Sequence, residues 1–334
     1  MSFPSRLFPV GSRIVKNGCL GMVAAKGSCQ MCTEIGKHVP PPSVGVVKRN
    51  WTHRFTQEGI FEPSESAEFI IAHALGEKSL INVNHARRLT KEQIETIRRL
   101  CKERLTGKPI QYVIGEWDFH GIKVDLKPPV LIPRPETEHL VDLAITDIQD
   151  HRSELFRCLE IGCGSGAISL ALLRAFPQVH MTAIDLSPTA CDLTKHNAAK
   201  CGVIQQMDVH CLDLTEETVN NALFSKSQYE LIISNPPYVC TQEIAELRTE
   251  IRDFEDHKAL DGGPDGLRVI KFVLAAANNA LCEDGSLWLE VGDEHAKLIP
   301  DFVKEMDLQY IGTHEDFTKT PRFCHLRKSS TKKS

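Results

Sequence analysis

The chain has 334 residues, a length that predicts two domains at roughly 150 residues per domain. Hydrophobic residues make up 42% of the chain and charged residues 25%, which is the composition of a globular protein and excludes a fibrous or wholly disordered one. No apolar run reaches the roughly 18 residues that a membrane-spanning helix needs, so we expect no membrane association.

The charge is unevenly distributed along the chain. Residues 1–33 contain four basic residues and no acidic one, so the rest of the chain carries a net charge of −9. An acidic body argues against a broad basic face for nucleic acid, and we expect no direct nucleic-acid binding. The 12 cysteines are scattered and are interpreted as reduced thiols. Cys29 and Cys32 form a C-x-x-C, but no second pair stands at a zinc-site spacing, so no metal site is expected.

Residues 1–48 show no lasting helical or strand period and are predicted to be a leader without a fold of its own. A basic N-terminus free of acids is typical of mitochondrial transit peptides and predicts import into the matrix. The alternatives are a disordered tail or a wrongly assigned start codon. The basic residues of the tail, 329–334, are interpreted as a solvated terminus.

Residues 49–110 are predicted to form a small helical domain. One helix follows Pro63 and ends before Gly76, and a second opens at Thr90 with Gln93 three positions on, which is the spacing of a capping box. The second helix is expected to bury one stripe, formed by Ile94, Ile97, Cys101 and Leu105. Such a stripe indicates packing between helices and no particular activity. Short β-like runs broken by glycines then predict a hairpin linker over residues 111–134.

Strands and helices alternate through residues 135–328. Strands are predicted at 158–161, 179–184, 209–212, 229–233 and 286–291. This alternation predicts an α/β domain with a mostly parallel, doubly wound sheet covered on both faces, which binds ligands beyond the carboxyl ends of its strands. Pro133 and Pro135 are expected to hold Arg134 and Glu136 on a stiff segment, unless Pro135 simply begins a helix.

A glycine-rich turn follows the first predicted strand. Gly162, Gly164 and Gly166 allow a tight turn and a close approach to a ligand, with a spacing that differs from the G-x-G-x-x-G of nicotinamide-binding proteins. Asp185 ends the second strand, where a carboxylate can accept hydrogen bonds from a ribose diol, and Asp213 ends the third, where it could lie beside an adenine amino group. Each aspartate could instead be a helix N-cap, but their joint occurrence favours a nucleoside pocket.

The sequence Asn235-Pro236-Pro237-Tyr238 follows the fourth predicted strand. Two consecutive prolines remove two backbone donors and leave carbonyl groups free to face a ligand. The side-chain oxygen of Asn235 and the carbonyl of Pro236 can accept both hydrogens of a planar NH2 group, over which Tyr238 can stack. A turn that only ends the strand is the alternative.

Glu160 to Gly166 read E-x-G-x-G-x-G, and together with the acidic end of the second strand and N-P-P-Y they resemble class I S-adenosylmethionine-dependent methyltransferases. With G-E-W-D-F at 115–119, I-P-R-P-E-T-E at 132–138 and A-L-D-G-G at 259–263, residues 52–328 resemble the HemK/PrmC family. That family methylates the side-chain amide of the glutamine in the Gly-Gly-Gln motif of peptide chain release factors. The basic leader points to a mitochondrial member.

The resemblance implies a class I methyltransferase fold, Rossmann-like and doubly wound, behind a small N-terminal helical domain that docks a mitochondrial release factor. It assigns S-adenosylmethionine to Glu160, Gly162, Cys163, Gly164, Ser165, Gly166, Asp185, Asp213, Leu214 and Asn235. Leu214 stands where bacterial relatives carry an aromatic residue. It assigns the substrate to Asn235, Pro236, Pro237, Tyr238, Arg134, Pro135 and Glu136, and catalysis to Asn235, Pro236 and Tyr238.

Three alternative functions stay open. The nearest is a nucleic-acid adenine methyltransferase, because N-P-P-Y can also hold an exocyclic amino group of a flipped base. The acidic body counts against it. A nicotinamide oxidoreductase is disfavoured by the glycine spacing, and a non-catalytic binding protein could use the same fold.

Overall fold

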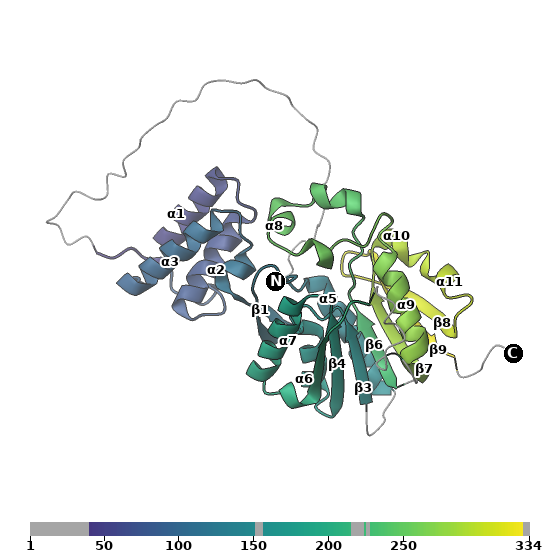
Figure 1. Cartoon of the computed structure of the whole chain (residues 1–334). Coiled ribbons are helices and arrows are strands. Elements are labelled where there is room, and N and C mark those ends of the chain that lie inside the picture. Colours follow the sequence, from purple (N-terminus) through teal and green to yellow (C-terminus); the bar gives the residue numbers. More distant parts are fainter. Residues whose placement is uncertain (1–39, 151–155, 215–223, 225–227, 330–334) are drawn as a thin grey trace, which may run out of the picture. The chain divides into compact units, whose positions relative to one another are not determined.

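The structure is a computed structural model that describes residues 40–150, 156–214, 224 and 228–329, so the C-x-x-C of Cys29 and Cys32 lies outside it. The chain divides into two compact units, a helical one that ends at Val113 and an α/β one that begins at Ile114 (Figure 1). No helix in the described parts of the chain is both long and apolar enough to cross a membrane.

The helical unit contains α1 (Val44–Gln57), α2 (Pro63–Leu75) and α3 (Lys91–Arg104). Helix α1 begins inside the segment 1–48, so the folded part starts earlier than the leader boundary that the sequence predicted. The capping box of α3 is confirmed. The Gln93 backbone N–H donates to Thr90 Oγ1 at 3.2 Å, and the Thr90 backbone N–H donates to Gln93 Oε1 at 2.9 Å.

The buried face of α3 differs from the predicted stripe at its end. Arg104 is only 2% exposed, whereas Leu105 lies half-buried beside it. The guanidinium of Arg104 donates to Ser66 Oγ at 3.0 Å and to the carbonyl oxygens of Phe61 and Lys108, each at 2.9 Å. Because these acceptors pair its donors, a charged side chain can take an interior position that the hydrophobic pattern assigned to leucine.

The segment between the two predicted domains is part helix and part hairpin. Residues Ile110–Ile114 form the short helix α4, where the sequence suggested an extended run. Strands β1 (Glu116–Phe119) and β2 (Ile122–Asp125) then pair antiparallel, as the hairpin prediction required. His120 and Gly121 connect them with φ angles of 46° and 73°, the left-handed conformation that tight hairpin turns need at both central residues.

The α/β unit is built on a seven-stranded sheet in the order β5-β4-β3-β6-β7-β9-β8. Strands β5, β4, β3, β6 and β7 run parallel, β9 pairs antiparallel with β7, and β8 pairs antiparallel with β9. The strands are β3 (Phe156–Ile161), β4 (Val179–Asp185), β5 (Met207–Cys211), β6 (Tyr229–Ser234), β7 (Leu281–Glu290), β8 (Leu308–Glu315) and β9 (Pro321–Lys328). The five predicted strands are confirmed with shifted ends, whereas β8 and β9 were not predicted.

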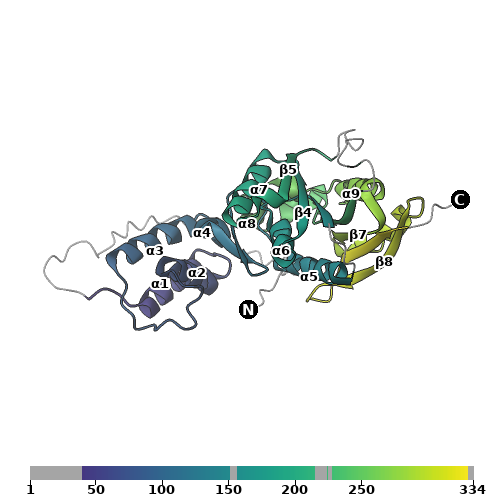
Figure 2. The same cartoon turned by 90° about the horizontal axis from the view of Figure 1, so that it is seen from below.

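Helices cover both faces of the sheet, with α9 on the face opposite α5 and α6 (Figure 2). Their bounds are α5 (Pro135–Asp150), α6 (Ala167–Ala175), α7 (Pro188–Lys200), α8 (Thr249–Arg252), α9 (Arg268–Ala280), α10 (Asp293–Ala296) and α11 (Ile299–Phe302). Fully buried Ile232, Leu287, Ile270 and Val273 belong to one core cluster, in which α9 packs on the sheet. This double covering explains why β6 and the second half of β7 read as nearly continuous apolar runs.

Candidate active site

The sheet register brings the glycine turn and N-P-P-Y together. Ile161 at the end of β3 pairs with Ser234 at the end of β6, and Ser234 Oγ donates to the Ile161 carbonyl oxygen at 2.7 Å. A Cβ placed on Gly162 would lie 3.9 Å from the carbonyl oxygen of Asn235. The two motifs are therefore neighbours at the carboxyl edge of the parallel strands, where α/β sheets bind ligands.

Each glycine of the turn takes the left-handed conformation, with φ of +80° at Gly162, +54° at Gly164 and +81° at Gly166. A Cβ on Gly166 would press on the Thr194 side chain at 3.0 Å, whereas a Cβ on Gly164 would meet no protein atom within 4 Å. Thr194 Oγ1 also donates to the Gly164 carbonyl oxygen at 3.1 Å. The turn is thus packed on its inner side and open above Gly164.

Glu160 holds this turn from inside the sheet. Its side chain is 1% exposed, and its Oε2 accepts hydrogen bonds from both the backbone N–H and the hydroxyl of Ser169. Ser169 lies in the first turn of α6, whose N-cap residue Gly166 has no side chain to satisfy the free N–H groups. Burial raises the pKa of Glu160 to about 8. Glu160 therefore caps α6, and a direct contact with a cofactor stays a prediction.

Asp185 ends β4 beside the glycine turn. Its Oδ2 accepts the Gly164 N–H at 2.9 Å and its Oδ1 accepts the Ser187 N–H at 2.8 Å. Burial raises the pKa of this carboxyl, while the two backbone N–H groups favour its charged form. A carboxylate has about four acceptor positions, so each oxygen retains one for a further donor. Two vicinal hydroxyls of a ribose match that arrangement.

The remaining predicted cofactor residues lie around the same edge. Asp213 is half-buried after β5, and the Leu212 N–H donates to the Asp185 carbonyl oxygen at 2.9 Å, which brings this segment to the end of β4. Leu214 is 7% exposed and belongs to the core cluster that includes Ile184. Cys163 and Ser165 of the glycine turn are buried. Their contacts to a cofactor stay predictions.

The residues at this edge fit a bound S-adenosylmethionine. The open space above Gly164, where a Cβ would meet nothing, adjoins a carboxylate whose free acceptor positions suit ribose hydroxyls. Within the described residues no cluster of three metal-ligating side chains occurs.

The amide of Asn235 is held by its nitrogen. Asn235 Nδ2 donates to Thr137 Oγ1 at 3.0 Å, and Thr137 Oγ1 donates to Glu290 Oε2 at 2.8 Å. Tyr238 donates its phenolic hydrogen to Glu290 Oε1 at 3.3 Å, and burial raises the pKa of Tyr238 so that the phenol keeps this proton. This bond turns the side-chain oxygen of Asn235 away from Thr137, and its role as an acceptor for a ligand stays a prediction.

The A-L-D-G-G segment supports the backbone of N-P-P-Y. The Val239 N–H donates to the Leu260 carbonyl oxygen at 2.9 Å, and the Gly262 N–H donates to the Val239 carbonyl oxygen at 2.8 Å. A Cβ on Gly262 would lie 2.8 Å from the Pro237 carbonyl oxygen, and one on Gly266 would overlap the Tyr238 carbonyl oxygen. Glycine is required at these two positions because neighbouring atoms, including the main chain of N-P-P-Y, fill the space of a side chain.

The segment predicted to touch the substrate begins helix α5. The Arg134 Nη2 atom donates to both oxygens of the buried Glu255, at 2.8 and 2.7 Å. Pro135 is exposed and occupies the first position of α5, whereas Glu136 is buried in the first turn. The helix-start alternative is thus confirmed. Binding of substrate by these three residues stays a prediction.

Two residues of the site, Thr137 and Glu290, were missed by the sequence reasoning. Thr137 lies within I-P-R-P-E-T-E, but a neutral threonine in a motif gives no signal of its own. Glu290 is the last residue of β7. A carboxylate that ends a buried strand next to the N-P-P-Y strand was the available signal.

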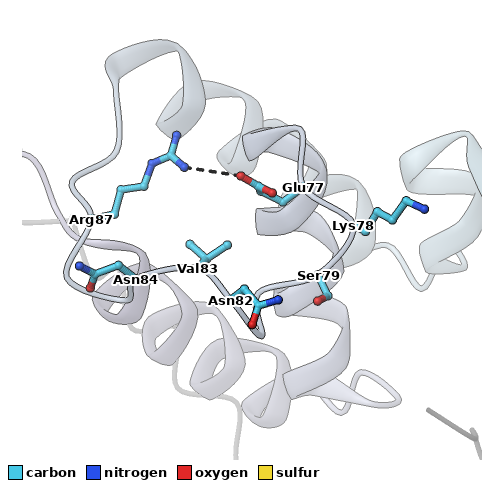
Figure 3. A pocket seen from close by; sticks show the side chains of 7 residues that line it. All are labelled: Glu77, Lys78, Ser79, Asn82, Val83, Asn84 and Arg87. Carbon is cyan, nitrogen blue, oxygen red and sulfur yellow. Dashed lines mark ion pairs between the residues drawn. The ribbon is translucent and has the colours of Figure 1, made fainter.

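The helical unit has a hollow of about 400 Å³ in the loop after α2 (Figure 3). Its lining is Glu77, Lys78, Ser79, Asn82, Val83, Asn84 and Arg87. Among these residues, Arg87 Nη1 and Glu77 Oε1 form an ion pair at 3.8 Å (Figure 3). None of the predicted site residues lines this hollow.

Strand order, glycine turn and strand-end carboxylate together place the α/β unit among the class I S-adenosylmethionine-dependent methyltransferases, and S-adenosylmethionine is its cofactor. The family model described as Methyltransferase small domain matches residues 142–251, and the one described as PrmC N-terminal domain matches residues 47–115. The solved hMettl16 catalytic domain in complex with MAT2A 3′UTR hairpin 6 is 14% identical, with a TM-score of 0.48, and covers 64% of this chain and 77% of that chain.

Two relatives identify the family to which the chain belongs within this class of methyltransferases. The MTRF1L release factor glutamine methyltransferase of Homo sapiens is 38% identical over 305 residues, which cover 86% of this chain and 90% of the relative. The release factor glutamine methyltransferase of Chlorobaculum tepidum is 34% identical over 243 residues, which cover 71% of this chain and 81% of the relative. The chain belongs to the release factor glutamine methyltransferase family, as its resemblance to HemK/PrmC predicted, and is a methyltransferase enzyme.

Proposed function

We propose that this chain methylates the side-chain amide nitrogen of the glutamine in the Gly-Gly-Gln motif of mitochondrial peptide chain release factors, and so supports translation termination. The Asn235 amide carries this proposal. Its nitrogen is engaged by Thr137 at 3.0 Å, so its oxygen is directed to a donor. Membership of the family, with relatives named as release factor glutamine methyltransferases, supports the substrate.

Asn235 Oδ1 and the Pro236 carbonyl would accept the two N–H groups of the glutamine amide. Bound S-adenosylmethionine supplies an electrophilic methyl group on its sulfonium. With both hydrogens fixed, the nitrogen lone pair can face that methyl group, and both hydrogen bonds strengthen as positive charge develops on nitrogen. Tyr238, held through its hydroxyl by Glu290, would pack over the planar amide.

An amide nitrogen is a weak nucleophile that no side chain here can deprotonate near neutral pH. Orientation of two bound reactants is worth roughly 7–11 kcal/mol, so the nitrogen need not be deprotonated before it reacts. The N–CH3 bond would form as the S–CH3 bond of the sulfonium breaks, and the methylated nitrogen, which is then strongly acidic, would lose one of its two protons to water. The contribution of Asn235, Pro236 and Tyr238 is therefore to position the acceptor nitrogen. The residues predicted to hold S-adenosylmethionine, which lie between Glu160 and Leu214 and include Asn235, would position the donor.

The helical unit would dock the folded release factor, as a macromolecular substrate requires more contact than a loop offers. Ile81 supports this, because it is a large apolar side chain that is 62% exposed in this unit. Ile81→Glu should raise the KM for folded release factor and leave that for a short Gly-Gly-Gln peptide unchanged. Ile311→Glu, at an apolar position 46% exposed on β8, is the matched control. Equal effects of Ile81→Glu on both substrates would count against docking.

Matrix localisation is part of the proposal and rests on the basic leader, whose residues 1–39 lie outside the described part of the chain. A fluorescent protein fused behind residues 1–48 should reach the mitochondrial matrix. A diffuse cytosolic signal would refute import.

Mass spectrometry of release factor incubated with the enzyme and S-adenosylmethionine tests the reaction directly. We expect one added methyl on the Gly-Gly-Gln glutamine with wild type and none with Asn235→Ala, while the Kd for S-adenosylmethionine in the variant stays within about tenfold, the effect of a single hydrogen bond. Absence of product with wild type, combined with methylation of adenine in an oligonucleotide, would favour the nucleic-acid alternative.

A further inference from the structure

Three side chains from separate elements form a continuous hydrogen-bonded chain behind the N-P-P-Y motif. Thr137 in the first turn of α5 is 4% exposed and Glu290 at the end of β7 is 1% exposed. The Thr137 hydroxyl lies between the Glu290 carboxylate at 2.8 Å and the Asn235 amide nitrogen at 3.0 Å. Glu290 touches no ligand in the proposed reaction, so its burial needs another explanation.

Donors and acceptors in this series of hydrogen bonds have a fixed order because the Thr137 hydroxyl carries a single hydrogen. An ionised Glu290 can only accept, so the Thr137 hydrogen is directed to it. The Thr137 oxygen can then only accept, and of the two ends of the Asn235 amide only the nitrogen can donate to it. The amide oxygen must therefore face away from Thr137, toward the position of the substrate.

We propose that Thr137 and Glu290 are positioning residues that fix the orientation of the Asn235 amide and thereby present Oδ1 to the acceptor NH2 group of the substrate. This inference rests on the proposed function of Asn235. A reversed amide would set its own NH2 group against the NH2 group of the substrate, two donors with no acceptor between them. The hydroxyl therefore selects one of two amide orientations that are nearly equal in shape.

The charge on Glu290 decides which groups donate and which accept in this series of hydrogen bonds. Burial raises the pKa of Glu290 to about 7, and the bond from Thr137, the charge of Arg322 on β9 and the bond from Tyr238 hold it from rising further. The charge of Glu136, in the first turn of α5, raises the pKa of Glu290. A protonated Glu290 can donate to Thr137, which frees the Thr137 hydrogen for the amide and favours the reversed orientation. Activity should therefore fall as the pH decreases through about 7.

Steady-state methylation of release factor by the full chain, measured from pH 6 to 9, tests this positioning role. Thr137→Val removes the hydroxyl at nearly constant volume, and we expect kcat to fall at least tenfold while the KM for release factor and the Kd for S-adenosylmethionine stay within about threefold. Thr137→Ser restores the hydroxyl and should recover most of kcat. Thr146→Val makes the same substitution at an exposed position of α5 and should match wild type.

Glu290→Gln keeps an acceptor oxygen for Thr137 but cannot titrate. We expect its kcat to lose the decrease below pH 7 that wild type shows. An undiminished kcat in Thr137→Val, or an unchanged acid limb in Glu290→Gln, would overturn the proposal. Equal losses in Thr137→Val and Thr137→Ser, with weaker cofactor binding in both, would indicate a structural role and also overturn it.

A measurement without substrate separates this inference from the proposed function. In protein labelled with ¹⁵N at asparagine, the Asn235 side-chain NH2 signal should shift and exchange faster with solvent in Thr137→Val, and should keep its wild-type position in Thr146→Val. Unchanged Asn235 signals in Thr137→Val would refute the positioning role even if wild type methylates release factor. A wild type that leaves release factor unmethylated but shows the NMR effect would refute the substrate alone.

Discussion

Gly164→Ala is the sharpest test of where the cofactor lies. Gly164 has φ of +54°, and a Cβ there would meet no protein atom within 4 Å. Gly202, in the turn after α7, has φ of +74° and equally open surroundings. In the cofactor-free protein, alanine should therefore lower the free energy of unfolding by the same amount at either position. They differ in that only Gly164 borders the space assigned to S-adenosylmethionine.

The backbone alone sets the cost to stability. A left-handed conformation costs an L-residue roughly 1–2 kcal/mol, so both alanine variants should lose that much free energy of unfolding and have a Tm lower by only a few degrees. For cofactor binding, one methyl group forced into a closely packed contact costs about 1–3 kcal/mol, which corresponds to a Kd weakened by roughly 5- to 150-fold. We expect this loss for Gly164→Ala and none for Gly202→Ala.

Thermal unfolding of the cofactor-free variants and titration calorimetry with S-adenosylmethionine measure the two effects separately. Equal Tm values with a selective loss of affinity in Gly164→Ala would place the cofactor against the open side of the turn. A Gly164→Ala variant that binds S-adenosylmethionine like wild type would refute that placement. A loss of affinity in Gly202→Ala as well would show that backbone strain, not contact, governs binding.

Three further predictions concern the strand ends. Asp185→Ala should weaken the Kd for S-adenosylmethionine at least 100-fold by calorimetry, because two charge-assisted hydrogen bonds contribute about 1.5–3 kcal/mol each. The pKa of Glu160 rises from 4.5 to about 8 on folding, so wild-type stability decreases as the pH increases from 4.5 to 8, and urea unfolding of Glu160→Gln should lack this decrease. Gly266→Ala drives a Cβ into the Tyr238 carbonyl oxygen at a φ of +69°. Overpacking of about 1–3 kcal/mol and a left-handed alanine of about 1–2 kcal/mol together predict a loss of about 2–5 kcal/mol in urea unfolding, whereas Gly312→Ala, with open surroundings, should be near neutral.

The arrangement of the predicted cofactor residues could be derived from the sequence because it is local. Glu160, the three glycines and Asp185 lie within one β3-α6-β4 unit, where strand period and turn chemistry fix the geometry. Even so, Glu160 turned out to cap α6 through Ser169. The pattern showed that a carboxylate was buried there, but only the fold shows which donors it meets.

The parts of the fold that were missed have physical reasons. Strands β8 and β9 pair antiparallel at one edge of the sheet, and β8 alternates between buried and exposed residues too weakly to stand out from a loop. Residues 110–114 carry β-favouring side chains but complete a helical turn, a tertiary override of local propensity. Arg104 is buried because three acceptors happen to surround it, which no periodicity reports.

The acceptor half of the site could not be predicted because its members meet only in the folded chain. Thr137 and Glu290 are 153 positions apart, and Thr137 and Asn235 are 98 apart. A buried carboxylate weakens a fold unless donors satisfy it, so Glu290 depends on the donors around it. The donors to the Glu290 side chain are Thr137, which holds Asn235, and Tyr238, which lies three residues further along the same turn. Within the described residues, the hydrogen bonds that the Glu290 carboxylate accepts from Thr137 and Tyr238 lead to the N-P-P-Y turn, and the orientation that Glu290 imposes on that turn explains why a carboxylate is buried there.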